Sequence, residues 1–228
     1  MHPMIAYLRR ELRKAADPKK ARPMRAYMKN VQPFYGIPMP ARRNIFHSAQ
    51  KKFTIATYDE YETVIKELWR GKFREELYLA VDIAMYYKTF RSDRAMRLYE
   101  WMLKSADNWD TVDTVASHLV GDLVLQNRKH ESILKKWTRS KNKWLRRTAL
   151  LAHLRHKKKT NRHLLEETIL SMMDEREFFI QKAIGWILRQ YAYTNSKRVT
   201  QFVKKHSGRL SRLAKREALK HQNKRIRS

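Results

Sequence analysis

Apolar residues recur along most of the chain with the three-to-four-residue spacing of an amphipathic helix. Ile5, Leu8 and Leu12 form the first such stripe, on one face of a helix. Pro18, preceded by an aspartate cap, predicts the start of a second helix that runs to about Asn30. The chain shows no clear strand alternation and has only five Gly and six Pro. The pattern therefore predicts an all-α protein.

The segment 31–40, VQPFYGIPMP, interrupts this pattern with three prolines and a glycine, so we expect a loop there. After it, the same spacing predicts a series of helices, with boundaries placed to within several residues. The predicted helices cover 41–51, 58–70, 73–90, 93–105, 109–126, 130–139, 143–158, 161–173, 177–193, 196–206 and 211–222.

An internal repeat organises these helices. Phe73, Trp109, Trp144 and Phe179 are spaced by 36, 35 and 35 residues, and each opens a predicted helix after a polar, turn-like segment. This period is typical of helical repeats, which stack helix pairs into a curved solenoid with a concave face suited to an elongated ligand. An ordinary helical bundle with coincidental spacing is the alternative.

The charge of the chain points to a polyanionic partner. Lys and Arg number 51 against 22 Asp and Glu, a formal net charge of +29, and the cations extend from the N-terminus to Arg227. Nucleic acid is the first candidate and an anionic membrane surface the second. No run of about 18 apolar residues predicts a membrane span. A positively charged concave face would fit a nucleic-acid duplex, and we expect such a face here.

Composition and motifs exclude several classes of chemistry. With 228 residues, of which 43% are hydrophobic, the chain is long enough to bury a core. The absence of cysteine excludes disulfides, thiolate zinc sites, iron–sulfur clusters and a cysteine nucleophile. No P-loop, Gly-rich dinucleotide motif, HExxH or Gly-x-Ser-x-Gly is present, so no cofactor is implied. MHPMIAYLRRELRK lacks the apolar core of a signal peptide, and we expect a cytoplasmic location.

Asp113 departs from the pattern of its own repeat. The residues four positions after the four repeat aromatics are Leu77, Asp113, Thr148 and Ala183, so only one of them is charged. The residues seven positions after them are Ala80, Ala116, Leu151 and Trp186, so only one of them is an indole. The position three residues after the aromatic is a cation in the two repeats that follow Asp113, namely Arg147 and Lys182. Stacked repeats would bring these groups together with Trp109.

A purely structural interpretation stays open for each of these residues. Asp113 could be a solvated residue or an acid paired with Arg147 on a surface helix, since a lone helical aspartate usually has a structural role. Trp109 and Trp144 could pack between repeats, and we prefer that interpretation for Trp144. His153, His156 and His163 lie near the basic run RHKKK (155–159) and are interpreted as surface histidines rather than a metal site.

Several segments resemble one family throughout nearly the whole chain. NWDTVD (108–113), KWLRRTALL (143–151), EFFIQKAIGWILRQYA (177–192), RAYMKN (25–30) and GIPMPARR (36–43) are similar to the AlkD-type alkylpurine DNA glycosylases. This bacterial and archaeal family is built from HEAT-like repeats. The resemblance is specific at the Trp-x-x-x-Asp pair and at FFIQKAIGW and weak at the basic C-terminal end, about 211–228. We expect a single HEAT-like repeat domain over 1–228.

The resemblance also implies roles for individual residues. Asp113 would be the catalytic carboxylate. Trp109 and Trp186 would pack against the deoxyribose and backbone of the lesion nucleotide, and Arg147 would meet a phosphate nearby. Tyr27 matches a residue on the DNA-facing side of the family.

One departure concerns the loop. Pro38 and Met39 stand where the family often offers polar side chains, which puts DNA contacts from this loop in doubt. Among the basic groups, we expect phosphate contacts from Arg155, Lys157 and Lys158, from the pair at 204–205 and from the run that begins at Lys215. Lys182 is interpreted as a phosphate contact or a solvated neighbour.

The implied activity is hydrolysis of the N-glycosidic bond of cationic N3- or N7-alkylated purines in duplex DNA, which leaves an abasic site. A cationic base is already a good leaving group, so one carboxylate suffices and neither a general acid nor a base-flipping pocket is expected. We expect a monomer that needs no cofactor or metal and is associated with the nucleoid of a bacterial or archaeal cell. The rivals are a non-catalytic binder of DNA structure and an RNA- or ribosome-associated scaffold.

Overall fold

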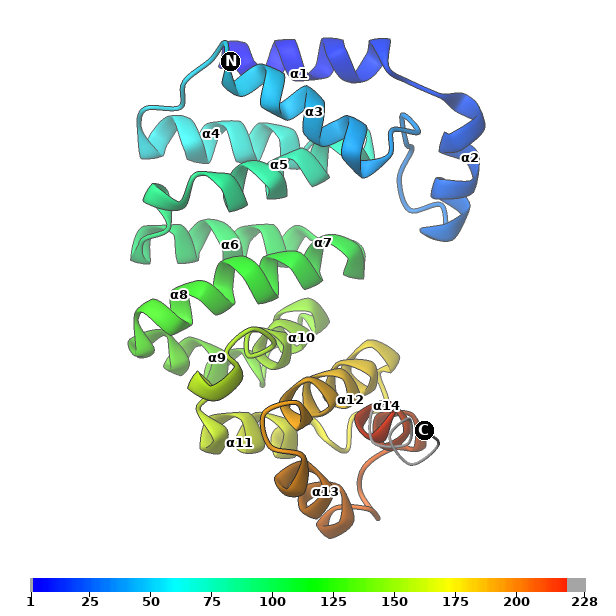
Figure 1. Cartoon of the computed structure of the whole chain (residues 1–228), viewed down its shortest axis with the longest axis vertical. Coiled ribbons are helices and arrows are strands. Elements are labelled where there is room, and N and C mark those ends of the chain that lie inside the picture. Colours follow the sequence, from blue (N-terminus) through cyan, green and yellow to red (C-terminus); the bar gives the residue numbers. More distant parts are fainter. Residues whose placement is uncertain (1, 221–228) are drawn as a thin grey trace. The chain divides into compact units, whose positions relative to one another are not determined.

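The computed structural model describes residues 2–220, and within them every regular element is helical. This confirms the all-α prediction. Figure 1 labels the helices in chain order. The described chain divides into two compact units, unit 1 with residues 2–98 and 105–111 and unit 2 with residues 99–104 and 112–220. Each unit is described by itself, and the single domain expected over 1–228 stays a prediction.

Unit 1 is built from five α-helices and one 3₁₀ turn before the hairpin that crosses the unit boundary. They are α1 (Pro3–Lys14), α2 (Pro18–Tyr27), α3 (Met39–Gln50), α4 (Tyr58–Trp69), α5 (Arg74–Tyr86) and η1 (Lys88–Phe90). The helices α1 and α3 pack together, as do α4 and α5. The stripe predicted in the first helix is confirmed, because Ile5, Leu8 and Leu12 are fully buried.

The hairpin α6 (Asp93–Ser105) and α7 (Trp109–Thr114) has residues in both units. Unit 2 then continues with helices that pack in consecutive pairs, such as α9 with α10 and α12 with α13. Its elements are η2 (Val115–Val120), α8 (Gly121–Gln126), η3 (Arg128–His130), α9 (Glu131–Trp137), α10 (Lys143–Leu151), η4 (Lys157–Lys159), α11 (Arg162–Met172), α12 (Phe178–Ala192), α13 (Ser196–Lys205) and α14 (Arg212–Leu219). Pairing within each unit fits HEAT-like repeats, whereas the curvature and the basic concave face stay predictions.

Polar N-cap residues begin most of these helices. Asp17 accepts hydrogen bonds from the backbone amides of Lys19 and Lys20 at the start of α2. At α4, Thr57 and Glu60 form a reciprocal capping box. Asparagines cap α10, α11 and α13 in the same way. The caps satisfy amides that have no partner inside the helix, which explains why the predicted starts agree well with the structure.

The ends of three predicted helices differ from the structure. The helix predicted over 143–158 ends at Leu151, because the backbone then changes to tight turns in which Leu154 bonds to Leu151 and His156 to His153. The helix predicted over 73–90 ends at Tyr86 and is followed by a 3₁₀ turn. The helix predicted over 211–222 and the basic end at 211–228 reach beyond residue 220, and residues 221–228 lie outside the described residues.

The proline-rich loop is held by a buried acid. Both carboxylate oxygens of Glu75, which is fully buried, accept hydrogen bonds from the backbone amides of Tyr35, Gly36 and Ile37 at 2.8–3.0 Å. Gly36 has a φ of +88°, and a Cβ atom there would lie 2.1 Å from the carbonyl oxygen of Asp17. The loop therefore packs directly on the start of α2, which only glycine permits. Met39, which the loop presents at the start of α3, is exposed.

Candidate active site

Asp113 and Arg147 form a two-point ion pair inside unit 2. Nε of Arg147 donates to Oδ1 of Asp113 at 2.7 Å, and Nη2 donates to Oδ2 at 2.8 Å. The exposed fractions of the two side chains are 14% and 4%. Fork-to-fork pairing of this kind fixes the plane of the carboxylate as well as its position. Asp113 is therefore largely buried and paired with Arg147 from the next repeat, which is one of the structural alternatives that the sequence left open.

Arg147 also connects the helix of Asp113 to α12. Its Nη1 atom donates to the carbonyl oxygen of Phe179 in the first turn of α12. The guanidinium is buried and directed at these protein groups, so in this structure Arg147 positions Asp113, while the phosphate contact expected of it stays a prediction. A lysine could not make the same three directed contacts.

The helix that carries Asp113 changes its geometry immediately afterwards. Residues 115–120 form a π-helix, in which the amide of Gly121 bonds to the carbonyl oxygen of Ala116. The hydroxyl of Ser117 donates to the carbonyl oxygen of Asp113 at 2.6 Å. Short π segments occur frequently at functional sites because they wind the helix more widely and redirect side chains. The sequence indicated one continuous helix over 109–126 and did not reveal this segment.

Within unit 1, the structure brings together two other residues named from the sequence. The rings of Tyr27, at the end of α2, and Trp109, at the start of α7, meet edge to face with centroids 6.3 Å apart. Tyr27 is 72% exposed. The side chain of Asn108 donates to the carbonyl oxygen of Met28 at 3.3 Å and so fixes the end of α2 to the start of α7. Tyr27 and Trp109 therefore present a supported aromatic surface.

A second acid of α7, which the sequence did not single out, has a structural role. Both oxygens of Asp110 are occupied by the guanidinium of Arg74, and the hydroxyl of Tyr78 donates to Oδ2 at 2.5 Å. Burial, followed by the charge of Asp110, raises the pKa of Tyr78. The signal available in the sequence is Arg74, a cation directly after the aromatic that opens its repeat. Asp110 is committed to packing within unit 1.

The other two tryptophans of the repeats differ in exposure. Trp144 is buried, and its ring lies 5.1 Å from that of Phe179, which agrees with the packing interpretation. Trp186 is partly exposed and lies on α12, two helical turns after Phe179. Arg147 anchors that same helix through the Phe179 carbonyl oxygen. The partly exposed ring of Trp186 can therefore contact a ligand, whereas the buried ring of Trp144 cannot.

The cations expected to meet DNA occupy different settings. Lys182 does not join Asp113, because its Nζ atom pairs with Glu217 at 2.9 Å, and this hydrogen bond lowers the pKa of Glu217. Arg155 is 48% exposed and lies 3.9 Å from Asp122. Lys157 and Lys158 are exposed in η4. The run 155–159 thus offers its charges to solvent, as phosphate binding requires.

The interpretation of His153 and His156 as surface residues is wrong. Both are buried, and their rings lie 5.3 Å apart. The tight turns after α10 direct them inward, and Nε2 of His156 lies 2.9 Å from the carbonyl oxygen of Gly121 at the end of the π-helix. Burial, with the charges of His156 and Arg128, lowers the pKa of His153 to about 3. No cluster with metal-ligand character occurs among residues 2–220.

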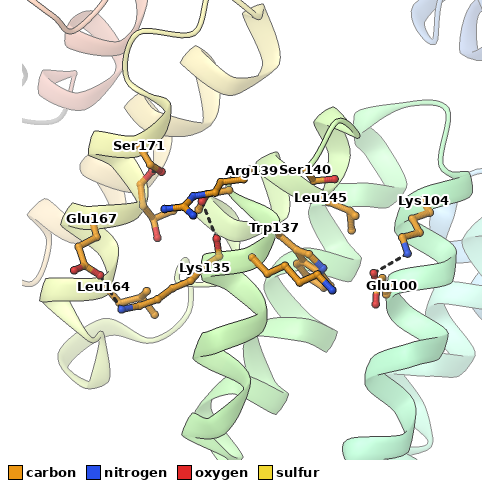
Figure 2. Close-up of a pocket in the computed structure, with 13 residues that line it drawn as sticks. Glu100, Lys104, Lys135, Trp137, Arg139, Ser140, Leu145, Leu164, Glu167 and Ser171 are labelled. Carbon is orange, nitrogen blue, oxygen red and sulfur yellow. Dashed lines mark hydrogen bonds and ion pairs between the residues drawn. The ribbon is translucent and has the colours of Figure 1, made fainter.

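The largest groove described in unit 2 lies away from these residues. It has a volume of about 940 Å³, and Figure 2 shows that Trp137, Arg139 and Ser171 line it. Two of its lysines are neutralised, Lys104 by Glu100 and Lys135 by Glu167. None of the residues expected to bind or cut the substrate lines it. Among the described residues, no helix is long and apolar enough to cross a membrane.

Comparisons with known proteins show the family of the chain. The family model of the DNA alkylation repair enzymes matches residues 8–222. A solved structure from Enterococcus faecalis, described as a predicted DNA alkylation repair enzyme, is 33% identical in sequence, with a TM-score of 0.83 over 90% of this chain and 95% of that chain. No curated protein sequence matches significantly. The match over nearly the whole chain shows that the protein belongs to the DNA alkylation repair enzyme family.

Proposed function

We propose that the protein is a monofunctional DNA glycosylase. It hydrolyses the N-glycosidic bond of cationic N3- or N7-alkylated purines in duplex DNA and leaves an abasic site. The observation that carries this proposal is the carboxylate of Asp113, which is held in one orientation by Arg147 and is still 14% exposed. Asp110, by comparison, is 9% exposed and is bound both by the guanidinium of Arg74 and by the hydroxyl of Tyr78.

The chemistry needs little more than this acid. Alkylation at N3 or N7 makes the purine cationic, so the base leaves without protonation. As the glycosidic bond stretches, the sugar acquires oxocarbenium character. A fixed carboxylate stabilises this positive charge and can direct a water molecule to the sugar. The positive charge of Arg147 lowers the free energy needed to keep this carboxylate charged in a partly dehydrated site. No cofactor is required for any of these steps.

Trp109 and Trp186 are also proposed to contact the substrate. Indole faces attract developing positive charge, and both tryptophans are partly exposed. Trp109 lies one helical turn before Asp113 on α7, and Tyr27 supports its ring. We propose that these surfaces hold the deoxyribose and the backbone of the lesion nucleotide, and that the base is not flipped into a pocket.

The setting of this reaction follows from the charge. With a net charge of +29, we propose that the protein acts as a monomer on double-stranded DNA in the cytoplasm of a bacterial or archaeal cell, associated with the nucleoid. Arg155, Lys157 and Lys158 are proposed to bind phosphates, because they are exposed. Lys182 is a weaker candidate, since Glu217 already neutralises it.

The deciding experiment is release of 7-methylguanine from methylated duplex DNA, measured by chromatography of the free base. The proposal expects release in single-turnover time courses and an intact strand that becomes alkali-labile. A non-catalytic binder of DNA structure would retain the duplex without releasing base. An RNA-associated scaffold would do neither and would prefer RNA in a competition with duplex DNA.

A further inference from the structure

A groove in unit 1 lies beneath the middle of α2. It has a volume of about 780 Å³, and its wall includes Arg13 at the end of α1 and Arg22 and Arg25 on α2. Phe34 and Phe73 contribute apolar surface from the loop and from the start of α5. No acidic residue lines this groove. Its composition therefore suits a ligand that is anionic and has an apolar edge.

The attachment of α2 leaves this groove open. At its N-terminal end, the amide of Asp17 bonds to the carbonyl oxygen of Tyr35 at 2.8 Å, and Gly36 allows close contact. At the other end, Met28 is buried and bonded to Asn108. Between these two points none of the ten helical residues is buried. Most helices derive their stability from a buried apolar face, so α2 is a helix held at its ends with an uncovered middle.

The three arginines lack the partners that comparable cations have elsewhere in the molecule. Within residues 2–220 their guanidinium groups form no ion pair and no hydrogen bond, and all three are exposed. In the groove of Figure 2, by contrast, Lys104 and Lys135 are each paired with a glutamate. Three like charges around one groove repel each other unless an anion offsets them. Arginine in particular binds phosphate with two parallel hydrogen bonds.

We propose that this arginine groove, formed by Arg13, Arg22 and Arg25, binds consecutive phosphates of a DNA strand. The strand belongs to the duplex at the proposed active site, so this inference rests on the proposed function. Five residues separate Arg22 from Tyr27, a rise of about 7.5 Å along α2, or about two base-pair steps of 3.4 Å. A strand that contacts the exposed ring of Tyr27 can thus continue along the same helix into the groove.

The test is the salt dependence of binding to an undamaged 20-base-pair duplex. Wild-type protein is compared with the triple variant Arg13→Gln, Arg22→Gln, Arg25→Gln by fluorescence anisotropy across a KCl series. Each lost phosphate contact changes the log–log slope by about 0.9. We expect the slope of the triple variant to be less negative by about 2 to 2.7, and each single variant to contribute roughly one third of this change.

A control variant removes the same charge from the same unit. Arg10, Lys66 and Arg94 are already paired with carboxylates, so replacing all three with glutamine alters net charge equally without opening a phosphate contact. Its slope should stay within about 0.5 of the wild-type value. Equal slopes for the two triple variants overturn the proposal. An unchanged slope for the groove variant also overturns it, and this is the result expected if the groove binds an acidic protein instead. Circular dichroism verifies that both variants are folded.

This measurement is independent of catalysis. Base release by the wild-type protein, run in parallel on methylated duplex, tests the proposed function alone. If wild-type protein releases no base while the salt slope of the groove variant is less negative as expected, the arginine groove is upheld and the glycosylase proposal fails. If base is released and the slope is unchanged, the groove proposal alone fails.

Discussion

Arg147 approaches Asp113 from the next repeat, 34 residues later in the chain, and holds both oxygens of its carboxylate at 2.7 and 2.8 Å. The same guanidinium reaches α12 through the carbonyl oxygen of Phe179. One buried side chain therefore sets the position of the proposed catalytic acid relative to two other helices of unit 2. Because it cannot lose its proton at physiological pH, Arg147 keeps its positive charge beside the Asp113 carboxylate while it orients it.

The first prediction concerns Asp113 itself. Asp113→Asn preserves size and one acceptor oxygen but removes the charge that stabilises the oxocarbenium ion, so single-turnover release of 7-methylguanine should fall at least about 100-fold. Affinity for undamaged duplex should be unchanged. Asp174→Asn, which removes an exposed carboxylate of unit 2 that is paired with Arg209 and not with Arg147, is the matched control. Near-wild-type excision by Asp113→Asn would refute the assignment.

Arg147 and Asp113 should be energetically coupled. Arg147→Gln leaves a largely buried carboxylate without its partner and should lower the free energy of unfolding by about 3 kcal/mol. The loss should be smaller by about 1 to 3 kcal/mol in the Asp113→Asn background, as measured by urea denaturation of all four proteins. Arg146→Gln, whose side chain pairs with Glu175 instead, should show no such coupling. If the effects of Arg147→Gln and Asp113→Asn on the free energy of unfolding are additive, the two residues are not coupled and the prediction is wrong.

Mild acid should destabilise unit 2 through its buried histidines. The folded-state pKa of His153 is lowered to about 3, and that of His156 is also lowered, chiefly by burial. The unfolded state takes up protons near pH 6.5 while the folded state does not, so stability falls as the pH drops below about 6.5 and continues to fall towards 3. For His153 alone the loss between pH 6.5 and 5 is about 2 kcal/mol.

Denaturant midpoints at pH 7 and pH 5 measure this effect. His153→Leu, which removes the titrating group and leaves no hydrogen bond broken among the described residues, should reduce the difference between the two pH values. His163→Gln, at an exposed position, should leave the difference as in the wild type. A wild-type protein equally stable at both pH values would show that these histidines are accessible to protons.

The basic run after α10 should contribute to DNA affinity. Replacing Arg155, Lys157 and Lys158 with glutamine should make the log–log salt slope for undamaged duplex less negative by up to about 2.7. The control replaces three cations of unit 2 that are already paired with glutamates, Lys104, Lys135 and Arg198. A slope unaffected by the first set would exclude this run from the bound surface.

Strand cleavage through a lysine is not expected. Lys182 is the lysine that the repeat aligned with the site, but its ammonium group is paired with Glu217. A charged, paired amine cannot attack C1′, so borohydride treatment of the protein on abasic or methylated duplex should trap no covalent complex. A trapped species that disappears in Lys182→Ala would show that the lysine carries the chemistry in place of Asp113.

Local regularities in the sequence were sufficient to determine the helices and to single out Asp113. Apolar spacing defines which face of a helix is buried, and polar caps define where it starts, because both depend on residues within one or two turns. The ends were less predictable. The tight turns at His153 and His156 and the π-helix after Asp113 depend on packing against other helices. The sequence VASHLV (115–120) carries no local signal for the π-helix.

The internal repeat also pointed to Arg147, since equivalent positions of stacked repeats become neighbours. It could not decide which cation would pair with the acid: only the tertiary structure assigned Arg147 to Asp113 and Lys182 to Glu217. Burial decided the rest. By local sequence, His153 and His156 beside a basic run are expected to be solvated, whereas the fold buries them inside unit 2. The arginines around the α2 groove form a cluster only once the loop at Gly36 packs on that helix. Such contacts join residues distant in the chain, and their energies depend on side chains that no local window contains.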